Sequence, residues 1–220
     1  MIRRKILSLI KQKDPDNPLE YVHDIVRDYA REKLDQHILD CRDCDICSEP
    51  KSITWGDTKA RLLIVSESVC EEQSGLGRSV YPLQDCPQRS LLESALGEYY
   101  NKAFYINAVN CMPCRKTGQG IAFRLPSKTE VENCRVFTDF ALDLVRPEAV
   151  LLLGPIALNL FEEKTMSEAR GEIISVQGIP AVATYHPDYF SRVGKMKSEL
   201  ILRELREQFR EDVKRILQYL

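Results

Sequence analysis

Four short apolar runs are the clearest feature of the hydrophobic pattern. Each run is almost continuous rather than alternating, and polar residues bound it on both sides. Such runs are typical of strands that are covered on both faces, as in a parallel sheet. The expected strands span residues 61–66, 103–109, 148–154 and 178–185, with a short edge segment at 53–56.

Segments with helical spacing of apolar residues separate these runs. Ser127 is a candidate N-cap, with Glu130 at the reciprocal position of a capping box, and Pro155 can open the next helix. Strands that alternate with helices favour an α/β fold, in which helices cover both faces of a parallel sheet. The expected helices span residues 1–13, 18–39, 89–100, 128–144, 155–161 and 195–220.

Two stretches lack periodicity and are expected to be long loops. Residues 66–88 contain two glycines and two prolines, and residues 116–126 lie among basic side chains. Loops of this length inside a compact domain are usually functional.

Composition excludes some classes of protein. The chain has 220 residues, 44% of them hydrophobic, and a net charge of −2. No apolar run is long enough to span a bilayer and the start is too polar for a signal peptide, so we expect a cytoplasmic protein. A nucleic-acid partner would have to contact a local basic patch, because the overall charge provides no attraction.

Eight cysteines are many for a cytoplasmic chain, since disulfides are disfavoured there and cysteine pairs more often bind metal. Cys70 and Cys86 are isolated in the sequence, and we interpret them as small buried hydrophobes. Residues 41–47 instead form a Cys-x-x-Cys-x-x-Cys series in a polar stretch, which packing does not explain. Spacing alone would combine the Cys-x-x-Cys pairs at 44–47 and 111–114 in a zinc site.

Chemically capable side chains occur at the ends of three expected strands. Glu67 follows the first strand, Asn107 lies near the end of the second, and His186 follows the fourth. Singly, each has an ordinary explanation as a cap, a turn residue or a satisfied buried group. The carboxyl ends of parallel strands share one edge, where open α/β sheets bind ligands. Their common position therefore favours a catalytic cleft.

Seven short motifs follow one another along the chain. They are Cys41-x-x-Cys44, Glu67-x-x-x-Glu71, Gly77-Arg78, Asn107-x-x-x-Cys111-x-Pro113, Cys134, Leu152-Leu153-Gly154-x-x-Ala157, and His186-Pro187 with Arg192. None is specific alone, but the ordered set resembles the iron–sulfur uracil-DNA glycosylases of the type-4 group. The resemblance implies a three-layer α/β/α sandwich with a central four-stranded parallel sheet. It also implies a [4Fe–4S] cluster and removal of uracil, or a related deaminated base, from DNA.

The resemblance also selects among the cysteines. The implied cluster ligands are Cys41, Cys44, Cys111 and Cys134. Ile46 and Gly56 follow the first pair in the register of the family, while Cys47 and Cys114 remain the principal rival ligands. The expected role of the cluster is structural, because its thiolates would join distant segments and position loops that face DNA.

The resemblance implies roles for the residues at the strand ends. A base in a duplex must be flipped into a pocket, or be taken from single-stranded DNA. The Asn107 amide can accept a hydrogen bond from uracil N3–H and donate one to O4, a pattern that cytosine reverses. His186 would hydrogen-bond the oxyanion on uracil O2. Glu67 would stabilise the sugar cation or orient the water.

Further residues are expected to contact the substrate. Ser68 and Val80 would bind the base. Phe190 is a candidate wedge for the vacated base stack. The residues expected to hold phosphates are Arg78, Arg192, Arg115 and Lys116.

The chain departs from the family pattern at three places. The Gly-Glu-x-Pro-Gly loop of the family is replaced at residues 66–70, where both glycines and the proline are absent. Val80 stands where an aromatic residue usually stacks on the base, and Asp188 stands where serine follows His-Pro. A base–aromatic stack is worth about 1–3 kcal/mol. Its loss would weaken base capture without abolishing the reaction.

We expect three parts in the chain and a monomer. These parts are an N-terminal helical extension (1–40), a glycosylase-like domain (41–193) and a C-terminal helix packed on that domain (194–220). A protein partner could bind through the terminal helices. The alternatives are a catalytically weakened glycosylase fold that binds DNA, a modified base or a protein, and an unrelated zinc protein. A covalent-trapping variant is disfavoured because the basic, histidine-bearing insertion of such enzymes is absent.

Overall fold

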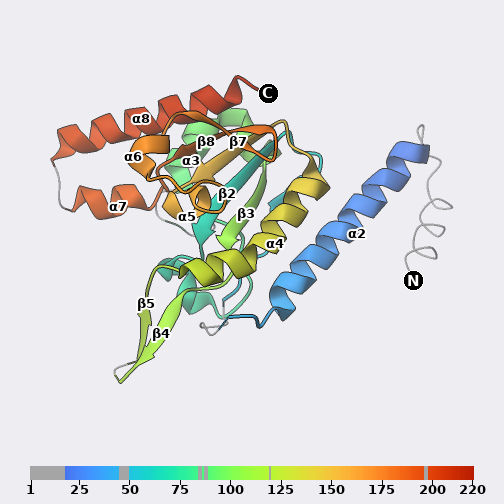
Figure 1. Ribbon diagram of the computed structural model, residues 1–220, viewed down its shortest axis with the longest axis horizontal. Helices are drawn as coiled ribbons and strands as arrows, with labels where there is room; N and C mark the ends of the chain where they lie inside the picture. Colours follow the sequence, from blue (N-terminus) through green and yellow to red (C-terminus); the bar gives the residue numbers. More distant parts are fainter. Residues whose placement is uncertain (1–17, 45–49, 84–85, 87–88, 119, 196–197) are drawn as a thin grey trace.

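A six-stranded sheet forms the centre of the protein, in the order β1-β3-β2-β6-β8-β7 (Figure 1). The structure is a computed structural model that describes residues 18–44, 50–83, 86, 89–118, 120–195 and 198–220. The inner four strands run parallel, and β1 and β7 are antiparallel edge strands. The strands are β1 (Trp55–Gly56), β2 (Leu62–Ser68), β3 (Phe104–Val109), β6 (Ala149–Leu153), β7 (Ile173–Val176) and β8 (Ile179–Thr184).

The predicted α/β fold with a parallel sheet is confirmed, but the sheet has six strands rather than four. The four predicted strands are the inner ones, and the short edge segment is β1. The sequence analysis missed β7, which has four residues and one exposed face. Gln177 and Gly178 join β7 to β8 with positive φ angles of 52° and 87°. Positive φ at both residues is typical of a tight hairpin turn.

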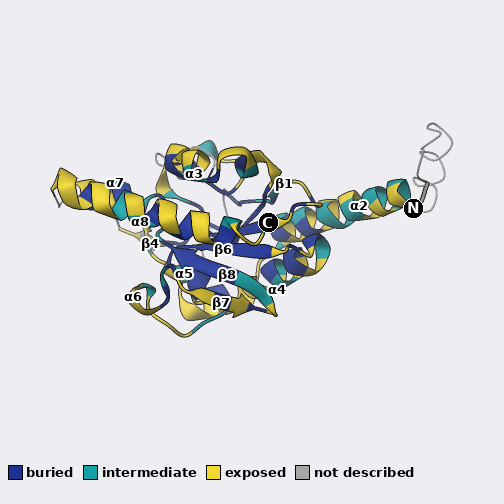
Figure 2. Ribbon diagram, turned by 90° about the horizontal axis from the view of Figure 1, so that it is seen from above, coloured by how far each residue is buried: buried dark blue, intermediate teal, exposed yellow. Residues whose placement is uncertain are grey.

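Helices cover both faces of this sheet, which makes three layers (Figures 1 and 2). Helices α4, α5 and α6 cover one face, with α2 beside α4, and α3, α7 and α8 cover the other. Their bounds are α2 (Pro18–Asp40), α3 (Arg89–Leu96), α4 (Lys128–Val145), α5 (Pro155–Leu158), α6 (Met166–Ala169), α7 (Tyr189–Gly194) and α8 (Glu199–Leu217). The helix expected at 1–13 lies outside the described residues. Among the described helices, none has the length and apolar character needed to cross a bilayer.

The capping box expected at α4 is present. The Ser127 hydroxyl accepts a hydrogen bond from the Glu130 backbone N–H at 3.3 Å, and the Glu130 carboxylate accepts one from the Ser127 N–H at 2.7 Å. Arg124 also donates to this carboxylate at 2.7 Å, which lowers the pKa of Glu130. The start of α4 is therefore fixed to the segment that precedes it.

The prediction of a loop at residues 116–126 is wrong. This region forms an antiparallel hairpin of β4 (Cys114–Thr117) and β5 (Gly120–Phe123), which projects from the rest of the domain in Figure 1. Ile121 and Phe123 on it are exposed. Apart from Cys114, the described side chains of these two strands are exposed or partly buried, so their sequence lacks the alternation that marks a half-buried strand. The first predicted loop also contains a 3-10 helix, η1 (Glu71–Leu76).

A buried lysine fastens α2 to the domain. Lys51 is 0% exposed, and its ammonium group donates to the carbonyl oxygens of Ile38, Leu39 and Cys41 at 3.1, 2.8 and 2.5 Å. These carbonyls belong to the end of α2, where the helix dipole favours a cation. The Lys51 backbone pairs with that of Cys111, which follows β3. One residue thus ties the end of α2 to the sheet.

A buried carboxylate fastens α8. Asp212 is 4% exposed, and it accepts hydrogen bonds from the Thr184 hydroxyl at 2.7 Å and from Arg170 at 2.9 Å. Arg215 donates to the carbonyl of Gly171. These contacts join α8 to the end of β8 and to the segment before β7.

We predict that Asp212→Ala lowers the free energy of unfolding by about 1–3 kcal/mol, because it leaves a buried hydroxyl without its partner. Urea unfolding would measure this loss. Glu211→Ala changes the exposed neighbour on the same helix and should have little effect. Equal stability of the two variants would contradict the prediction.

We also predict that Lys51→Met lowers the free energy of unfolding by about 1–3 kcal/mol, because it leaves buried carbonyls at the end of α2 without a donor. Chemical unfolding, followed by circular dichroism, would measure the loss. Lys59→Met is the matched control: this lysine forms an exposed ion pair with Asp24 and should contribute little.

Candidate active site and cysteine cluster

Strand register brings Asn107 and His186 to one place at the carboxyl edge of the sheet. Ser66 on β2 is the Cα partner of Asn107 on β3, so their side chains leave the same face of the sheet. The Ser66 hydroxyl lies 3.0 Å from Nε2 of His186, which follows β8. Residues from three separate strands therefore meet there.

The histidine is held in one neutral form. The Asp188 backbone N–H donates to Nδ1 of His186 at 3.2 Å, so the ring proton is on Nε2, where it faces Ser66. His186 is 5% exposed, and this burial lowers its pKa to about 3, with Arg192 adding to the effect. At neutral pH the imidazole can donate a hydrogen bond from Nε2 without carrying a charge.

Asn107 is buried, and the described part of the chain offers its side-chain amide no partner. The residue is 1% exposed, and neither its Oδ1 nor its Nδ2 has a hydrogen-bond partner among the described residues. Most buried polar groups in proteins are paired, and an unpaired one costs about 1–3 kcal/mol. This amide can therefore gain from a ligand that offers both a donor and an acceptor.

Glu67 lies at the end of β2 against the start of α5. Its Oε1 accepts a hydrogen bond from the Ile156 N–H at 3.3 Å. Gly154, with φ of +89°, makes room for the carboxylate, because a Cβ atom there would collide with it. Burial raises the pKa of Glu67 to about 7; the Ile156 N–H and Arg192 oppose this rise, and Asp188 adds to it. The carboxyl group is thus close to half ionised at neutral pH.

Arg192 connects the two predicted catalytic residues electrostatically. Its charge lowers the pKa values of both Glu67 and His186. Arg192 is exposed on α7 and lies 3.9 Å from the Asp188 carboxylate. His186 and Arg192 both line a cavity of about 740 Å³. Its other lining residues are Pro155, Asn159, Lys164, Thr165, Met166, Ser167, Tyr185, Tyr189 and Val193.

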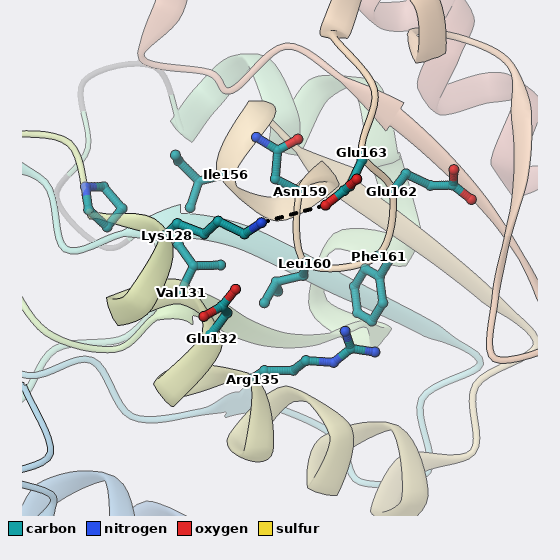
Figure 3. A pocket seen from close by; sticks show the side chains of 11 residues that line it. Lys128, Val131, Glu132, Arg135, Ile156, Asn159, Leu160, Phe161, Glu162 and Glu163 are labelled. Carbon is teal, nitrogen blue, oxygen red and sulfur yellow. Dashed lines mark ion pairs between the residues drawn. The ribbon is translucent and has the colours of Figure 1, made fainter.

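A second cavity, of about 560 Å³, lies between α4 and the segment that begins with α5 (Figure 3). Its wall includes the apolar side chains of Ile156, Leu160 and Phe161, and Lys128 points across it to Glu163, 3.5 Å away. None of these residues was predicted to be functional. Ile156 adjoins both regions, because its side chain lines this cavity while its N–H binds Glu67.

Two further residues expected to bind the base lie at the ends of β2 and β3. Val80 is buried in a small apolar cluster with Val69 and Met112. Ser68 is partly buried and is the Cα partner of Val109. The valine therefore fills a closed cluster in this structure and presents no open face for stacking.

The predicted DNA contacts divide into exposed and buried residues. Arg78, Arg115 and Arg192 are exposed, and the side chain of Lys116 lies outside what the structure describes. Phe190 is 1% exposed and packs edge to face on Phe209 of α8, with ring centroids 5.6 Å apart. Phe190 was predicted to be an inserted wedge; its ring belongs to the core under α8 here, so it would have to leave this core to enter a base stack.

Three of the predicted cluster ligands lie within electrostatic reach of the fourth, Cys134. Burial raises the pKa of Cys134 to about 12, the Asn110 N–H lowers it, and neighbouring Cys111, Cys44 and Cys41 raise it further. All four are reduced rather than disulfide-bonded. Asn133 on α4 donates to the Cys44 sulfur at 3.4 Å, which holds the segment after α2 against this helix.

The rival cysteines are placed differently. Cys114 is engaged in a disulfide, and Cys47 lies outside the described residues. Within the described part of the chain, no three histidine, cysteine, aspartate or glutamate side chains are close enough to share one metal ion. Cysteine thiolates are the donor set of a [4Fe–4S] cluster, so the residue types of the four predicted ligands fit that group.

Sequence reasoning missed several residues that organise the site. Ser66 was noted only as a departure from the family pattern, yet it contacts His186. Lys51, Asn133 and Ile156 gave no sequence signal. A lysine in a polar stretch is normally exposed, so its burial can be recognised only once the end of α2 is in place.

Comparison with known proteins agrees with this geometry. The chain is similar to a type-4 uracil-DNA glycosylase of Archaeoglobus fulgidus, with 26% identity over 90% of this chain and 92% of that protein. It is 24% identical to a type-4 uracil-DNA glycosylase of Thermotoga maritima, over 74% and 86% of the two chains. It is also 24% identical to a type-5 uracil-DNA glycosylase of Pyrobaculum aerophilum, over 69% and 72%.

The family match covers most of the domain. Residues 53–210 match the model of the Uracil DNA glycosylase superfamily. This range contains Glu67, Asn107 and His186 and extends into α8. Because the match spans well over half of the chain, the protein belongs to the uracil-DNA glycosylase superfamily.

Proposed function

We propose that this member of a DNA glycosylase family hydrolyses the N-glycosidic bond between uracil and deoxyribose in DNA. The observation that carries the proposal is the buried amide of Asn107, which has no partner among the described residues, beside the hydrogen-bonded pair of Ser66 and His186. An unpaired amide is costly unless a ligand completes it. The edge of uracil, with N3–H and O4, offers the donor and the acceptor that it lacks.

Discrimination against cytosine follows from the same amide if binding holds it in one orientation. With its Oδ1 toward N3 and its Nδ2 toward position 4, Asn107 faces a donor and an acceptor of uracil. Cytosine presents an acceptor at N3 and a donor at N4, so both contacts would become repulsive. Sites that hydrogen-bond a substrate reject analogues strongly, because the wrong ligand leaves buried groups unpaired.

His186 supplies the donor for the leaving base. When the bond between C1′ and N1 breaks, its electron pair stays on uracil and the negative charge is shared with O2. The Nε2–H that now faces Ser66 is proposed to donate to O2, stabilising this anion without transferring its proton. The low pKa of His186 suits this role, because the imidazole stays neutral. The Asp188 N–H donates to Nδ1, so the ring proton stays on Nε2.

Glu67 acts on the other product of bond cleavage. The sugar carries positive charge as the base leaves, and a water must add to C1′. The ionised carboxylate is proposed to stabilise that cation or to orient the water. Its position beside Gly154, at the end of the strand that carries Ser66, supports this assignment. Arg78, Arg115, Lys116 and Arg192 are proposed to hold DNA phosphates.

The thiols of Cys41, Cys44, Cys111 and Cys134 are proposed to hold a [4Fe–4S] cluster. Cys41 and Cys44 follow α2, Cys111 follows β3 and Cys134 lies on α4, so the cluster would join three parts of the fold. It would supply structural cross-linking rather than a reacting group. The base chemistry itself depends on the side chains at the strand ends.

A gel assay tests the activity. We expect the protein to create alkali-sensitive abasic sites in uracil-containing oligonucleotides. Asn107→Ala should lower excision about 30- to 10⁴-fold, because two unpaired base groups cost about 1–3 kcal/mol each, and His186→Ala about 10²–10³-fold. Asn101→Ala, at an exposed position on η2 (Gly97–Lys102), is the matched control. Failure of the unaltered protein on both single- and double-stranded substrates would overturn the proposal.

The pH profile tests Glu67. Excision should decline as the pH falls below about 7, because the carboxylate is the active form and burial places its pKa there. Above pH 5, His186 should add no second transition. Glu67→Gln should be slow and should lack this transition.

The same carboxylate gives a readout that does not depend on activity. A folded-state pKa above the ordinary 4.5 means that ionisation opposes folding. Stability of the unaltered protein should therefore fall between pH 4.5 and about 7, and Glu67→Gln should lack this fall. Thermal unfolding across this range measures the difference.

Metal content tests the cluster. An anaerobically purified sample should contain about four iron and four sulfide per chain, with broad visible absorbance. Cys134→Ala should lose the iron, whereas Cys86→Ser should retain it. Zinc in place of iron would contradict the assignment.

A further inference from the structure

Two cysteines outside the proposed chemistry face each other beside the strand that carries Glu67. The Cys70 sulfur lies 2.7 Å from the Cys86 sulfur. A disulfide places its sulfurs about 2.05 Å apart, so a shift of a fraction of an ångström would bring them to bonding distance. Cys70 comes two residues after β2 and Cys86 shortly before α3, and both pack at the core formed by α3 and α8.

The two thiols have different environments. Cys70 is partly exposed, whereas Cys86 is buried. The hydrogen bond with Cys70 and burial both raise the pKa of Cys86, so Cys86 keeps its proton and can donate it to the Cys70 sulfur. Reactive cysteines are accessible and act as thiolates. This arrangement makes Cys70 the attacking thiol and Cys86 the resolving thiol.

The surrounding charges select among oxidants. Glu72 and Asp188 are electrostatic neighbours of Cys86, and Glu71 follows Cys70 directly. These carboxylates repel anionic oxidants such as glutathione disulfide. Hydrogen peroxide is neutral and small, so it can reach the partly exposed sulfur.

We propose that Cys70 and Cys86 are a redox-active pair that hydrogen peroxide converts to an intramolecular disulfide. The Cys70 thiolate attacks one peroxide oxygen and displaces hydroxide, which leaves a sulfenic acid. The Cys86 sulfur then attacks the Cys70 sulfur, and the sulfenic hydroxyl leaves as water with the Cys86 proton. In total, two thiols and one peroxide give one disulfide and two waters. The sulfurs lose the two electrons that the peroxide gains.

The disulfide would restrain the residues that must move before a base can reach Asn107. It closes residues 70–86 into a loop that carries Val80, and Val80 packs with Val69 and Met112 at the ends of β2 and β3. Asn107 is buried near the end of β3, so a base can reach it only if residues at these ends move. This consequence rests on the proposed function: oxidation slows entry of the base, while the disulfide itself forms whatever the substrate.

Peptide mapping tests the pair directly. Trypsin separates the two cysteines, because Cys70 lies in peptide 62–78 and Cys86 in peptide 79–89, each with one cysteine. The full-length protein, with its native metal content, is treated with one equivalent of hydrogen peroxide, and free thiols are alkylated before digestion. Cys70→Ser and Cys86→Ser are the matched controls. Uracil excision is measured on the same samples before and after dithiothreitol.

We expect a cross-linked species of peptides 62–78 and 79–89 in the unaltered protein, absent from both variants and lost with dithiothreitol. Excision should be slowed by peroxide and restored by dithiothreitol in the unaltered protein only. Recovery of both peptides as alkylated monomers, or of Cys70 as sulfinic acid, would overturn the proposal of a redox-active pair. If peroxide slowed excision equally in Cys86→Ser, the proposed effect of the disulfide on the base site would be overturned. Cross-linking in a protein that excises no uracil would support the redox-active pair and contradict the proposed function.

Discussion

The parallel register between β2 and β3 is the constraint on which the candidate site depends. It places Ser66 beside Asn107 on one face of the sheet, and Ser66 in turn meets His186 across the end of β6. A slip of one residue would turn either side chain to the opposite face. Such a slip would lose core packing, because both faces of the inner strands are buried. Val65, for example, lies in one core and Ile64 in the other. Core packing thus fixes the positions of polar groups that contribute nothing to the core.

The sequence predicted the inner strands and the α4 capping box because buried runs and caps leave local signals. It also predicted that polar groups would meet at the strand ends, since parallel topology alone implies this. It failed where the signal is not local. The β4–β5 hairpin leaves most of its described side chains exposed, and the direction of the Phe190 ring depends on α8. Lys51 reads as a surface residue until the end of α2 and the backbone of Cys111 enclose it.

The departures from the family pattern have different consequences around His186. The group at Asp188 that fixes the imidazole is a backbone N–H, which any residue other than proline provides. Its side chain acts elsewhere: the carboxylate raises the pKa of Glu67 and lies near Arg192. At position 66 the change is direct, since the serine hydroxyl now contacts Nε2. Replacement at 188 therefore changes the local charge. The serine at 66 instead competes for the Nε2–H hydrogen bond that is proposed to stabilise the uracil oxyanion.

The Lys51 ammonium has a consequence for cofactor assembly. In small zinc domains the polypeptide orders only when metal arrives. Here Lys51 joins two of the cysteine-bearing segments through protein contacts alone: its ammonium binds the Cys41 carbonyl and its backbone pairs with that of Cys111. These contacts do not involve the proposed cluster. Binding of such a cluster would therefore add cross-links to segments that Lys51 already holds close together.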